Sequence, residues 1–435
     1  MNTNEYSQWF RGSTPYISAH RGKTFVVFIG GDSLEHLNIT NIVHDLALLH
    51  VLGVRLVLVH GGRPQLDNAL TDSVMHNQRR VTRAQDMNII NGVYGQLCSQ
   101  LEGLFSTGLP NTPLHNVEIS VVAGNFVTAR PIGVLDGVDH LFTGRMRNVD
   151  TQKVTTFLDA ESIVLISPMG YSPSGQAFNL AAEELAADVS VALQADKLIM
   201  LDELSHLLNA NGERESTVTP TSLQILIGND QDISHTTRAR LDTMIQAVRG
   251  GVKKAHIISF KEDGGLLQEL FTAEGVGTQV LEESTGPVRA AKREDVSDIV
   301  EIIRPLEEAG ILVRRSRDRL EQEIEHFLVA ELDGIVVGCC AIYPVEDEAE
   351  LACVAVHEHY RRRGSGVAIG ANLLRAAEDK ARNYGAMSLF ALTTQAQDWF
   401  IDQGFATADV SALPNSKQSL YNWQRGSKVV AKSLH

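Results

Sequence analysis

Residues 349–374 read AELACVAVHEHYRRRGSGVAIGANLL, and no other part of the sequence is as informative. An apolar, β-branched run ends at Val356, a basic turn follows, and the apolar residues beyond it recur at helical spacing. Glycines let backbone N–H groups approach an anion closely, while arginines and a helix N-terminus add positive charge. The stretch therefore predicts a strand, a pyrophosphate-binding loop of pattern RxxGxG and a long helix. The loop residues are Arg361, Arg362, Arg363, Gly364, Ser365 and Gly366.

The sequence on either side of this stretch predicts a compact α+β domain. The runs FLVAELD, IVVGCCAIYPV and SLFALTT are typical of strands, and VSDIVEIIRPLEEAG is typical of an amphipathic helix. A polar, turn-rich segment with a Gly-Pro pair, EESTGP, precedes the domain at 282–287. We therefore expect one domain over 1–283, a linker over 284–287 and a second domain over 288–435.

The first 283 residues alternate apolar strand-like runs with helical patterns. TFVVFIGG, VRLVLVHGG, SIVLISPMG, DKLIMLDE and KKAHIISF are nearly continuous in apolar or β-branched residues. Strands that are apolar on both faces belong to parallel sheets covered by helices on both sides. This pattern predicts an α/β domain.

Composition narrows the classes of function. The chain has 435 residues, a net charge of −15 and a sequence pI of about 5.5, which argues against a nucleic-acid or anionic-membrane partner. Its apolar runs are too short to span a bilayer, and its N-terminus lacks the features of a secretory signal. Four cysteines form no CxxC pair, and neither HExxH nor another zinc-type spacing occurs. We expect a cytoplasmic protein with reduced cysteines and no metal site.

Residues 288–435 resemble the GNAT acetyltransferases. The resemblance rests on the RxxGxG loop, on SLFALTT at the fifth-strand position and on WFIDQGF at 399–405, which is similar to the last core helix. It implies acetyl-CoA as co-substrate, no permanently bound cofactor, and contacts from Cys353, Val354 and Val356 in addition to the loop. Many members carry a tyrosine where this chain has Phe400, so no general acid is assigned.

Glu350 is the candidate general base. An amine nucleophile is protonated at neutral pH and must lose a proton before it attacks a thioester, which a nearby carboxylate can accept. Several GNAT enzymes carry a catalytic glutamate at the matching strand position, and a backbone N–H near Val354 would stabilise the thioester oxygen. The alternative is that Glu350 belongs to the acidic run EDEAE as part of a solvated turn.

Residues 1–283 resemble the amino-acid-kinase family, and N-acetylglutamate kinase in particular. The matching strings include GGDSL, LVHGGRPQLD, VVAGNFVTARPIG and SPSGQAFNLAAEELAA. The kinases need a lysine where this chain has Phe28, they carry an aspartate where it has Glu183, and TTRARLDTMIQAV lacks their Gly-Gly-Met turn. Phosphoryl transfer depends on positive charge at the transferring group. The chain lacks the lysine at position 28 and the turn that precedes the kinases' second phosphate-contacting lysine, so we expect no kinase activity. The fold class is thus an α/β, amino-acid-kinase-like parallel-sheet sandwich followed by an α+β GNAT domain.

The two domains in this order resemble the bacterial N-acetylglutamate synthases over nearly the whole chain. The resemblance implies acetyl transfer to the α-amine of L-glutamate, the first step of arginine biosynthesis, with L-arginine as feedback inhibitor. It also implies a homo-oligomer, possibly a hexamer. Arginines hold carboxylates through paired hydrogen bonds, and a carboxylate can hold the inhibitor's guanidinium. The implied glutamate-binding residues are Arg315, Arg425 and Ser427, and the implied arginine effector residues are Tyr16, His256, Glu269 and Gly275.

Three other functions remain open at this point. The chain could be a non-catalytic amino-acid sensor made of relic kinase and GNAT domains, a GNAT enzyme for another acceptor, or a working kinase with an added domain. The intact loop and Glu350 argue against the first, and Phe28 argues against the third. For the effector site, the alternative is that His256 is an ordinary core histidine.

Overall fold

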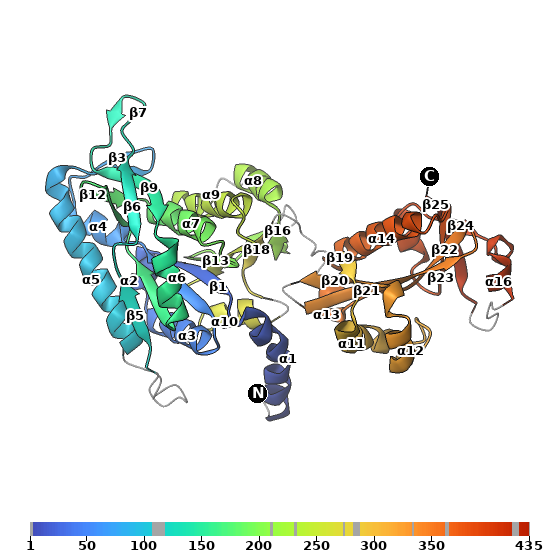
Figure 1. Ribbon diagram of the computed structural model, residues 1–435. Coiled ribbons are helices and arrows are strands. Elements are labelled where there is room, and N and C mark those ends of the chain that lie inside the picture. The colour runs from blue at the N-terminus through green and yellow to red at the C-terminus, as the bar shows by residue number, and fades with distance from the viewer. Residues whose placement is uncertain are drawn as a thin grey trace. The chain divides into compact units, whose positions relative to one another are not determined.

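The computed structural model describes residues 3–106, 118–208, 212–229, 233–272, 275–281, 288–332, 335–361, 365–419 and 426–434. Contacts divide the chain into two units, Met1–Glu282 and Glu283–His435, and each unit is described here by itself (Figure 1). The predicted linker at 284–287 lies outside the described residues.

The first unit is built on an eight-stranded sheet with the order β16-β18-β17-β13-β1-β2-β10-β5. The central strands pair in parallel, as the apolar runs predict, and the antiparallel pairing of β18 with β17 is the departure from that prediction. The strands are β1 (Thr24–Ile29), β2 (Arg55–His60), β5 (Ser120–Ala123), β10 (Ser162–Ile166), β13 (Lys197–Asp202), β16 (Thr217–Val218), β17 (Lys254–Ser259) and β18 (Thr278–Val280).

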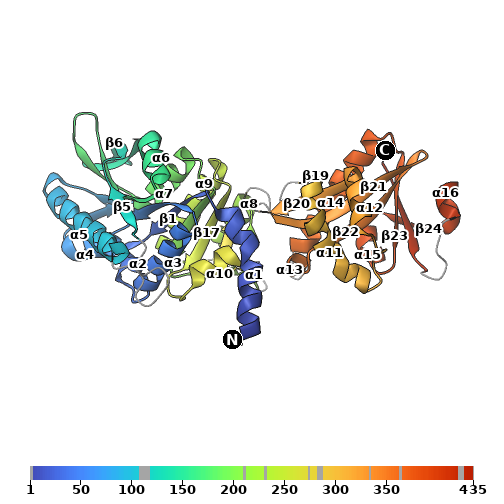
Figure 2. The ribbon, with the colours of Figure 1, turned by 60° about the horizontal axis from the view of Figure 1, so that its bottom comes forward.

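Helices cover both faces of this sheet (Figure 2). Alternate residues of one strand enter two different cores: Phe25 and Val27 pack on one face, Val26 and Phe28 on the other. One face carries α3 (Ile39–Val51), α5 (Met87–Ser106) and α10 (Gly265–Phe271); the other carries α6 (Thr151–Asp159), α7 (Ala182–Ala192), α8 (Pro220–Asn229) and α9 (His235–Arg249).

The remaining elements of the first unit lie around the sheet. A small closed barrel is formed by β6 (Val127–Pro131), β9 (Thr143–Val149), β11 (Met169–Tyr171) and β12 (Ala177–Leu180). The other helices are the long α1 (Thr3–His20) and the short α2 (Gly31–Glu35) and α4 (Arg63–Ala69). The hairpins are β3 (Val74–His76) with β4 (Arg79–Val81), β7 (Val134–Leu135) with β8 (Val138–Asp139), and β14 (Leu207–Leu208) with β15 (Arg214–Glu215).

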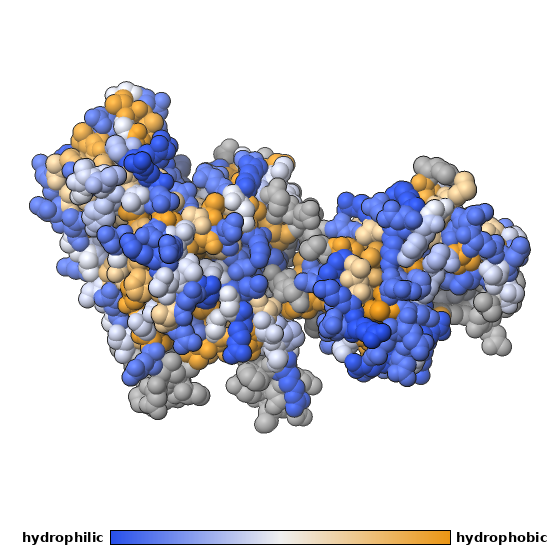
Figure 3. Space-filling view, in the orientation of Figure 1, coloured by the Kyte–Doolittle hydropathy of each residue, from blue (hydrophilic) through white to orange (hydrophobic). Residues whose placement is uncertain are grey.

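The β7–β8 hairpin exposes apolar side chains: Val134 and Leu135 of β7 are both exposed. In the view of Figure 3, orange atoms gather at the end of the first unit where Figure 1 places β7. Elsewhere in that view, hydrophilic residues cover most of the surface.

The second unit is a seven-stranded, largely antiparallel sheet with the order β19-β20-β21-β22-β23-β25-β24. Apolar residues of α11 and α12 cover one face of the sheet, and those of α14 and α15 cover the other. The elements are β19 (Val288–Ala290), α11 (Val296–Glu308), α12 (Arg317–Gln322), β20 (Phe327–Leu332), β21 (Ile335–Val345), β22 (Glu348–Val356), α13 (Glu358–Arg361), α14 (Ser365–Asn383), β23 (Ser388–Thr393), α15 (Gln397–Asp402), β24 (Ala406–Ala408), α16 (Asn415–Gln418) and β25 (Lys428–Ser433).

The mixed fold with a parallel sheet first and an α+β unit second is therefore confirmed. The second helix of this unit, α12, begins at Arg317 after its N-cap Ser316, whose side chain accepts a hydrogen bond from the Arg319 backbone N–H. Across the described residues, no helix is both long and apolar enough to cross a membrane.

Candidate functional site

Glu350 lies within strand β22 and not in the acidic turn before it. It is paired directly across from Tyr343 on β21 and from Phe390 on β23, so its side chain shares their face of the sheet. Only 15% of the Glu350 side chain is exposed, whereas Glu346 and Asp347 in the turn are exposed. The interpretation of Glu350 as a solvated turn acid is therefore wrong.

A β-bulge follows Glu350 on the same strand. The register between β21 and β22 shifts here: Ala341 pairs with Ala352, while Cys339 pairs with Ala355, so β22 carries one extra residue. Cys353 has a φ of +52°, a conformation that L-residues adopt only under constraint. Because of the bulge, Cys353 packs toward α11 instead of α14.

Strands β22 and β23 pair only at their beginnings. Their parallel register runs from Glu348–Ser388 to Leu351–Ala391, although β22 continues to Val356. Beyond Leu351 the two strands no longer form a ladder, so the segment with Val354 is not committed to β23. The role of a backbone N–H near Val354 in holding a thioester oxygen stays a prediction of the sequence analysis.

A polar cluster lies beside Glu350 on the same face. The Tyr343 hydroxyl donates a 2.7 Å hydrogen bond to Glu323, and Arg315 lies close to both. Burial acts to raise the pKa of Glu323, but the Tyr343 hydroxyl, Arg319 and Arg315 outweigh it and hold that pKa below its ordinary value. The Nε atom of Arg315 is buried without a hydrogen-bond partner among the described residues, so this guanidinium still has a donor to offer.

Cys353 indicates how closely these charges gather. Burial raises the pKa of its thiol to about 11, Arg315 opposes that rise, and Glu307, Glu323 and Glu350 add to it. The thiol is therefore neutral at physiological pH and unsuited to nucleophilic attack. The charges of Arg315 and Glu350 both act on the Cys353 thiol, so both side chains lie near it.

Glu350 forms an ion pair with Lys417, a residue that the sequence analysis missed. Its Nζ forms an ion pair with Oε2 of Glu350, and the two side chains are 29% and 15% exposed. Lys417 comes from the short helix α16, 67 residues further along the chain. Nothing in the sequence signals this pair, because only the packing of α16 against the sheet brings it about.

The remaining predicted residues of this site are only partly described. Strand β22 leads into α13, and α14 starts at Ser365, so the RxxGxG loop lies between a strand and a long helix as expected. Val356 is buried on the α14 face, and Ser427 is buried just before β25. The residues 362–364 and Arg425, together with the side chains of 361–368, lie outside the described residues.

Three of the four predicted effector residues, His256, Glu269 and Gly275, lie together around the Glu269 carboxylate. Its Oε1 lies 2.8 Å from Nδ1 of His256, and its Oε2 accepts 2.8 Å hydrogen bonds from the backbone N–H groups of Val276 and Gly277. Burial acts to raise the pKa of Glu269, but His256 and these two donors hold it below its ordinary value. A buried, ionised carboxylate therefore lies at the end of α10.

Gly275 and Tyr16 belong to the same region. Gly275 has a φ of +50°, and a Cβ there would come within 2.4 Å of Glu269 Oε2, so only glycine fits. Tyr16 lies on α1 and packs on the core that includes α10, and His20 of α1 lies 2.8 Å from the carbonyl of Leu270.

Burial and the charge of Lys197 lower the pKa of His256, while the neighbouring Glu269 acts to raise it.

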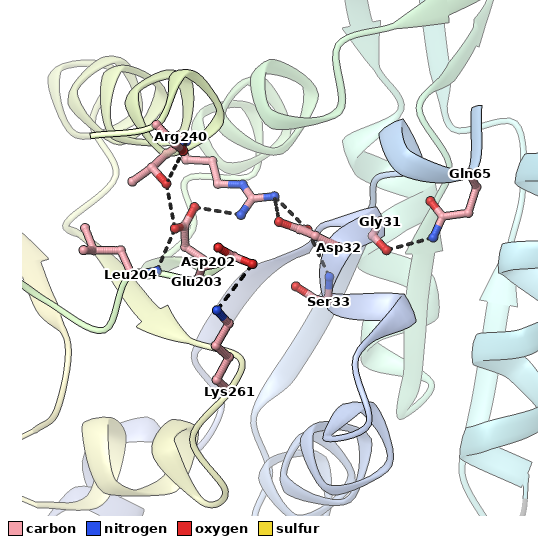
Figure 4. Close-up of polar contacts among 11 residues, drawn as sticks. Gly31, Asp32, Ser33, Gln65, Asp202, Glu203, Leu204, Arg240 and Lys261 are labelled. Atoms are coloured by element: carbon pink, nitrogen blue, oxygen red, sulfur yellow. Dashed lines mark hydrogen bonds and ion pairs between the residues drawn. The ribbon is translucent and has the colours of Figure 1, made fainter. Parts of the chain in front are cut away.

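A 250 Å³ cavity lies at the carboxyl ends of β1, β2 and β13, where a kinase would hold its substrates. Its floor is an internal ion network in which Arg240 of α9 binds Asp32 with both oxygens at 2.8 Å and Asp202 at 2.7 Å (Figure 4). The guanidinium also lies 5.3 Å from the ring of Phe28, the residue at the position of the kinase lysine.

This network explains the glycine pair at the end of β1. A Cβ at Gly30 would come within 2.4 Å of Arg240, and one at Gly31 would come within 2.9 Å of the Gly62 backbone. Sequence reasoning missed Arg240, although Asp32, in the turn after one buried strand, and Asp202, at the end of another, imply a buried counter-ion. Because both acids already hold this arginine, its charge is not available to a transferring phosphoryl group.

Comparisons with known proteins agree with this geometry. The amino acid kinase family matches residues 23–259, and the acetyltransferase (GNAT) family matches residues 296–405. An amino-acid acetyltransferase of Aeromonas salmonicida is 45% identical over 98% of this chain and 97% of its own length. One of Pseudomonas putida is 46% identical over 99% of this chain and its whole length.

Solved structures give the same result. N-acetylglutamate synthase from Neisseria gonorrhoeae, complexed with coenzyme A and L-arginine, is 35% identical, covers 99% of both chains and superposes with a TM-score of 0.83. The same enzyme complexed with coenzyme A and N-acetylglutamate is 36% identical, covers 99% of both chains and has a TM-score of 0.63.

Proposed function

This chain belongs to the amino-acid acetyltransferase family, and from that premise we propose that it moves acetyl from acetyl-CoA to the α-amine of L-glutamate and is inhibited by L-arginine. The observation that carries the acceptor site is Glu350, a largely buried carboxylate that lies just before the bulge and opening of β22, forms an ion pair with Lys417 and, like Arg315, lies near Cys353. The relatives bound to coenzyme A, arginine and N-acetylglutamate support the three ligands.

In the proposed mechanism, Glu350 accepts the proton of the substrate ammonium group, directly or through one water. The free amine attacks the thioester carbonyl carbon and a C–N bond forms. The C–S bond then breaks, and the second proton of the attacking nitrogen passes to the departing sulfur or to water, which releases coenzyme A as thiol or thiolate. The N–H of Val354 stabilises the charge that develops on the thioester oxygen. The RxxGxG loop and the N-terminus of α14 hold the pyrophosphate.

Arg315, Arg425 and Ser427 contribute to binding the acceptor's carboxylates in this proposal. The unpartnered Nε of Arg315 supports its part, because a buried donor without an acceptor costs free energy that a substrate carboxylate would recover.

The test is release of free thiol from acetyl-CoA with L-glutamate, measured with and without L-arginine. Glutamate-dependent release that arginine suppresses is expected. Release without suppression would remove the regulatory part, and release with aspartate or a lysine peptide but not with glutamate would overturn the acceptor assignment.

We propose that L-arginine binds around Tyr16, His256, Glu269 and Gly275, with Glu269 holding its guanidinium. Support comes from the ionised state and burial of Glu269 at the end of α10. The Glu269 carboxylate also accepts hydrogen bonds from the backbone N–H groups of Val276 and Gly277. Replacing Glu269 with glutamine therefore removes the negative charge while keeping the shape of the side chain.

Glu269→Gln should weaken arginine inhibition by roughly tenfold or more while leaving the uninhibited rate largely unchanged, because one charged hydrogen bond is lost. The readout is the arginine concentration that halves the rate. Glu262→Gln, at an exposed acid on the turn before α10, is the matched control. Equal inhibition of both variants would move the effector site elsewhere.

We also expect a homo-oligomer, possibly a hexamer, by resemblance to the N-acetylglutamate synthases. Light scattering of the purified full chain gives the mass, and a monomer at all concentrations would contradict this expectation.

A further inference from the structure

We propose that Lys417 couples acceptor recognition to release of the base: it pairs with Glu350 in the substrate-free protein and takes the α-carboxylate of the acceptor when the acceptor binds. The inference rests on the proposed function, because it takes Glu350 as the group that accepts the proton. Lys417 is thus a specificity residue for the same reaction.

The position of Lys417 is set by its surroundings. Ser416 donates hydrogen bonds to Glu346 from its hydroxyl, at 3.1 Å, and from its backbone N–H, at 3.5 Å. Leu413, just before α16, is buried against Phe390 on the same face of the sheet. The helix is therefore attached on both sides of the Glu350–Lys417 ion pair, and the pair is not a chance contact between two mobile surface chains.

This ion pair opposes catalysis as long as it is intact. A carboxylate that already binds an ammonium group is not free to bind and deprotonate a second one. An incoming amino acid carries its own ammonium group, which competes with Lys417 for Glu350. If Lys417 merely lost its partner, a positive charge would remain unpaired in a partly buried site, at a cost in free energy.

An α-amino acid removes that cost. Its carboxylate is attached to the same carbon as its amine, so an amine that reaches Glu350 brings the carboxylate next to Lys417. One ion pair within the protein is then exchanged for two with the substrate, and no charge is left alone. Arg315, whose charge acts on Cys353 as that of Glu350 does, remains with Arg425 and Ser427 for the side-chain carboxylate.

An amine without an α-carboxylate cannot complete the exchange. 4-Aminobutyrate, which is glutamate without that group, would displace Lys417 from Glu350 and offer it nothing in return. The site should therefore discriminate against it, and the discrimination should depend on Lys417.

The experiment compares Lys417→Met and Lys417→Arg in the full chain. Lys417→Met should lower kcat/KM for L-glutamate roughly tenfold to a hundredfold, mainly through KM, because a charged hydrogen bond to the substrate is lost. The KM for acetyl-CoA should not change. The inhibition constant of 4-aminobutyrate as a competitor of glutamate should stay the same or fall, and Lys417→Arg should restore most of the glutamate KM.

Lys432→Met is the matched control. Lys432 forms a 2.7 Å ion pair with Glu378, and their exposures of 28% and 10% are close to those of the Lys417 pair, but Glu378 lies on α14. This variant should leave the glutamate KM and the 4-aminobutyrate constant unchanged.

Two results would overturn the inference: an unchanged glutamate KM in Lys417→Met, or an equal loss of glutamate and 4-aminobutyrate binding, which a structural defect would produce. Both differ from failure of the proposed function, in which the wild-type chain itself shows no glutamate-dependent release of coenzyme A.

Discussion

At the scale of single residues, position in the strand separates the acids of one short run. The run EDEAE contains four carboxylates: Glu346 and Asp347 are exposed in the turn, whereas Glu348 and Glu350 lie on β22. Of these two, Glu350 lies across from Tyr343 and forms the ion pair with Lys417. The sequence analysis chose Glu350 by its strand position. The structure adds the reason, which is that the turn acids face water, and water screens their charge.

Glu350→Gln should lower kcat by about a hundredfold or more with little change in the KM for acetyl-CoA, because an amide cannot accept the proton. Steady-state kinetics with both substrates varied gives the two effects separately. Asp347→Asn, at an exposed acid of the turn three residues earlier, is the control and should turn over normally. Near-normal turnover of Glu350→Gln would remove this residue from the mechanism.

Asp45 on α3 gives a prediction about pH and stability. Burial and the nearby Asp263 raise the pKa of Asp45 to about 7. The folded state therefore binds this proton more tightly than the unfolded state, so Asp45 costs stability as pH rises from about 4 to about 7. Asp45→Asn should raise Tm by several degrees at pH 8 and by much less at pH 5. Equal gains at both pH values would contradict this explanation.

At the scale of elements, irregular backbone rather than regular structure creates the sites. The bulge at Cys353 redirects one strand face, and the short pairing of β22 with β23 opens a gap at Val354. Regular strand periodicity in the sequence predicts the strand but not the bulge, since one extra residue leaves the apolar pattern almost unchanged.

The turn after α10 allows a matched test of the effector site. Gly275 and Gly264 both have positive φ angles, so alanine at either position costs a similar backbone strain of about 1–2 kcal/mol. Only at Gly275 would the new Cβ strike Glu269; at Gly264 its nearest neighbour is 3.9 Å away. Gly275→Ala should weaken arginine inhibition and Gly264→Ala should not, as measured from inhibition curves. The same loss of arginine inhibition in both variants would mean that backbone strain, and not contact with Glu269, causes the effect.

At the scale of the whole molecule, the two units divide the work. The first unit has the sheet and cavity of the amino-acid-kinase family, but Arg240 is fixed between Asp32 and Asp202 beside Phe28, so its charge is not free for phosphoryl transfer. The second unit carries Glu350. In the proposed function, inhibition of one unit by a ligand of the other requires that arginine bind two states of the protein unequally.

Linkage makes this coupling measurable. If arginine weakens substrate binding by some factor, substrate must weaken arginine binding by the same factor. Titration of arginine into the full chain by calorimetry, with and without saturating coenzyme A and N-acetylglutamate, should show that loss of affinity. Identical arginine affinities would mean that inhibition acts on the chemical step and not on binding.

The sequence by itself determined the two folds, their order and the residue types at each site. Strand runs, the RxxGxG turn and the missing lysine at Phe28 are local features, and local features are readable along the chain. Only the tertiary structure decided which charges meet. Lys417 reaches Glu350 across 67 residues, and Arg240 reaches Asp32 across 208, because helix packing brings them together. Ion pairs of this kind depend on distances in space, and the spacing of residues in a sequence does not record those distances.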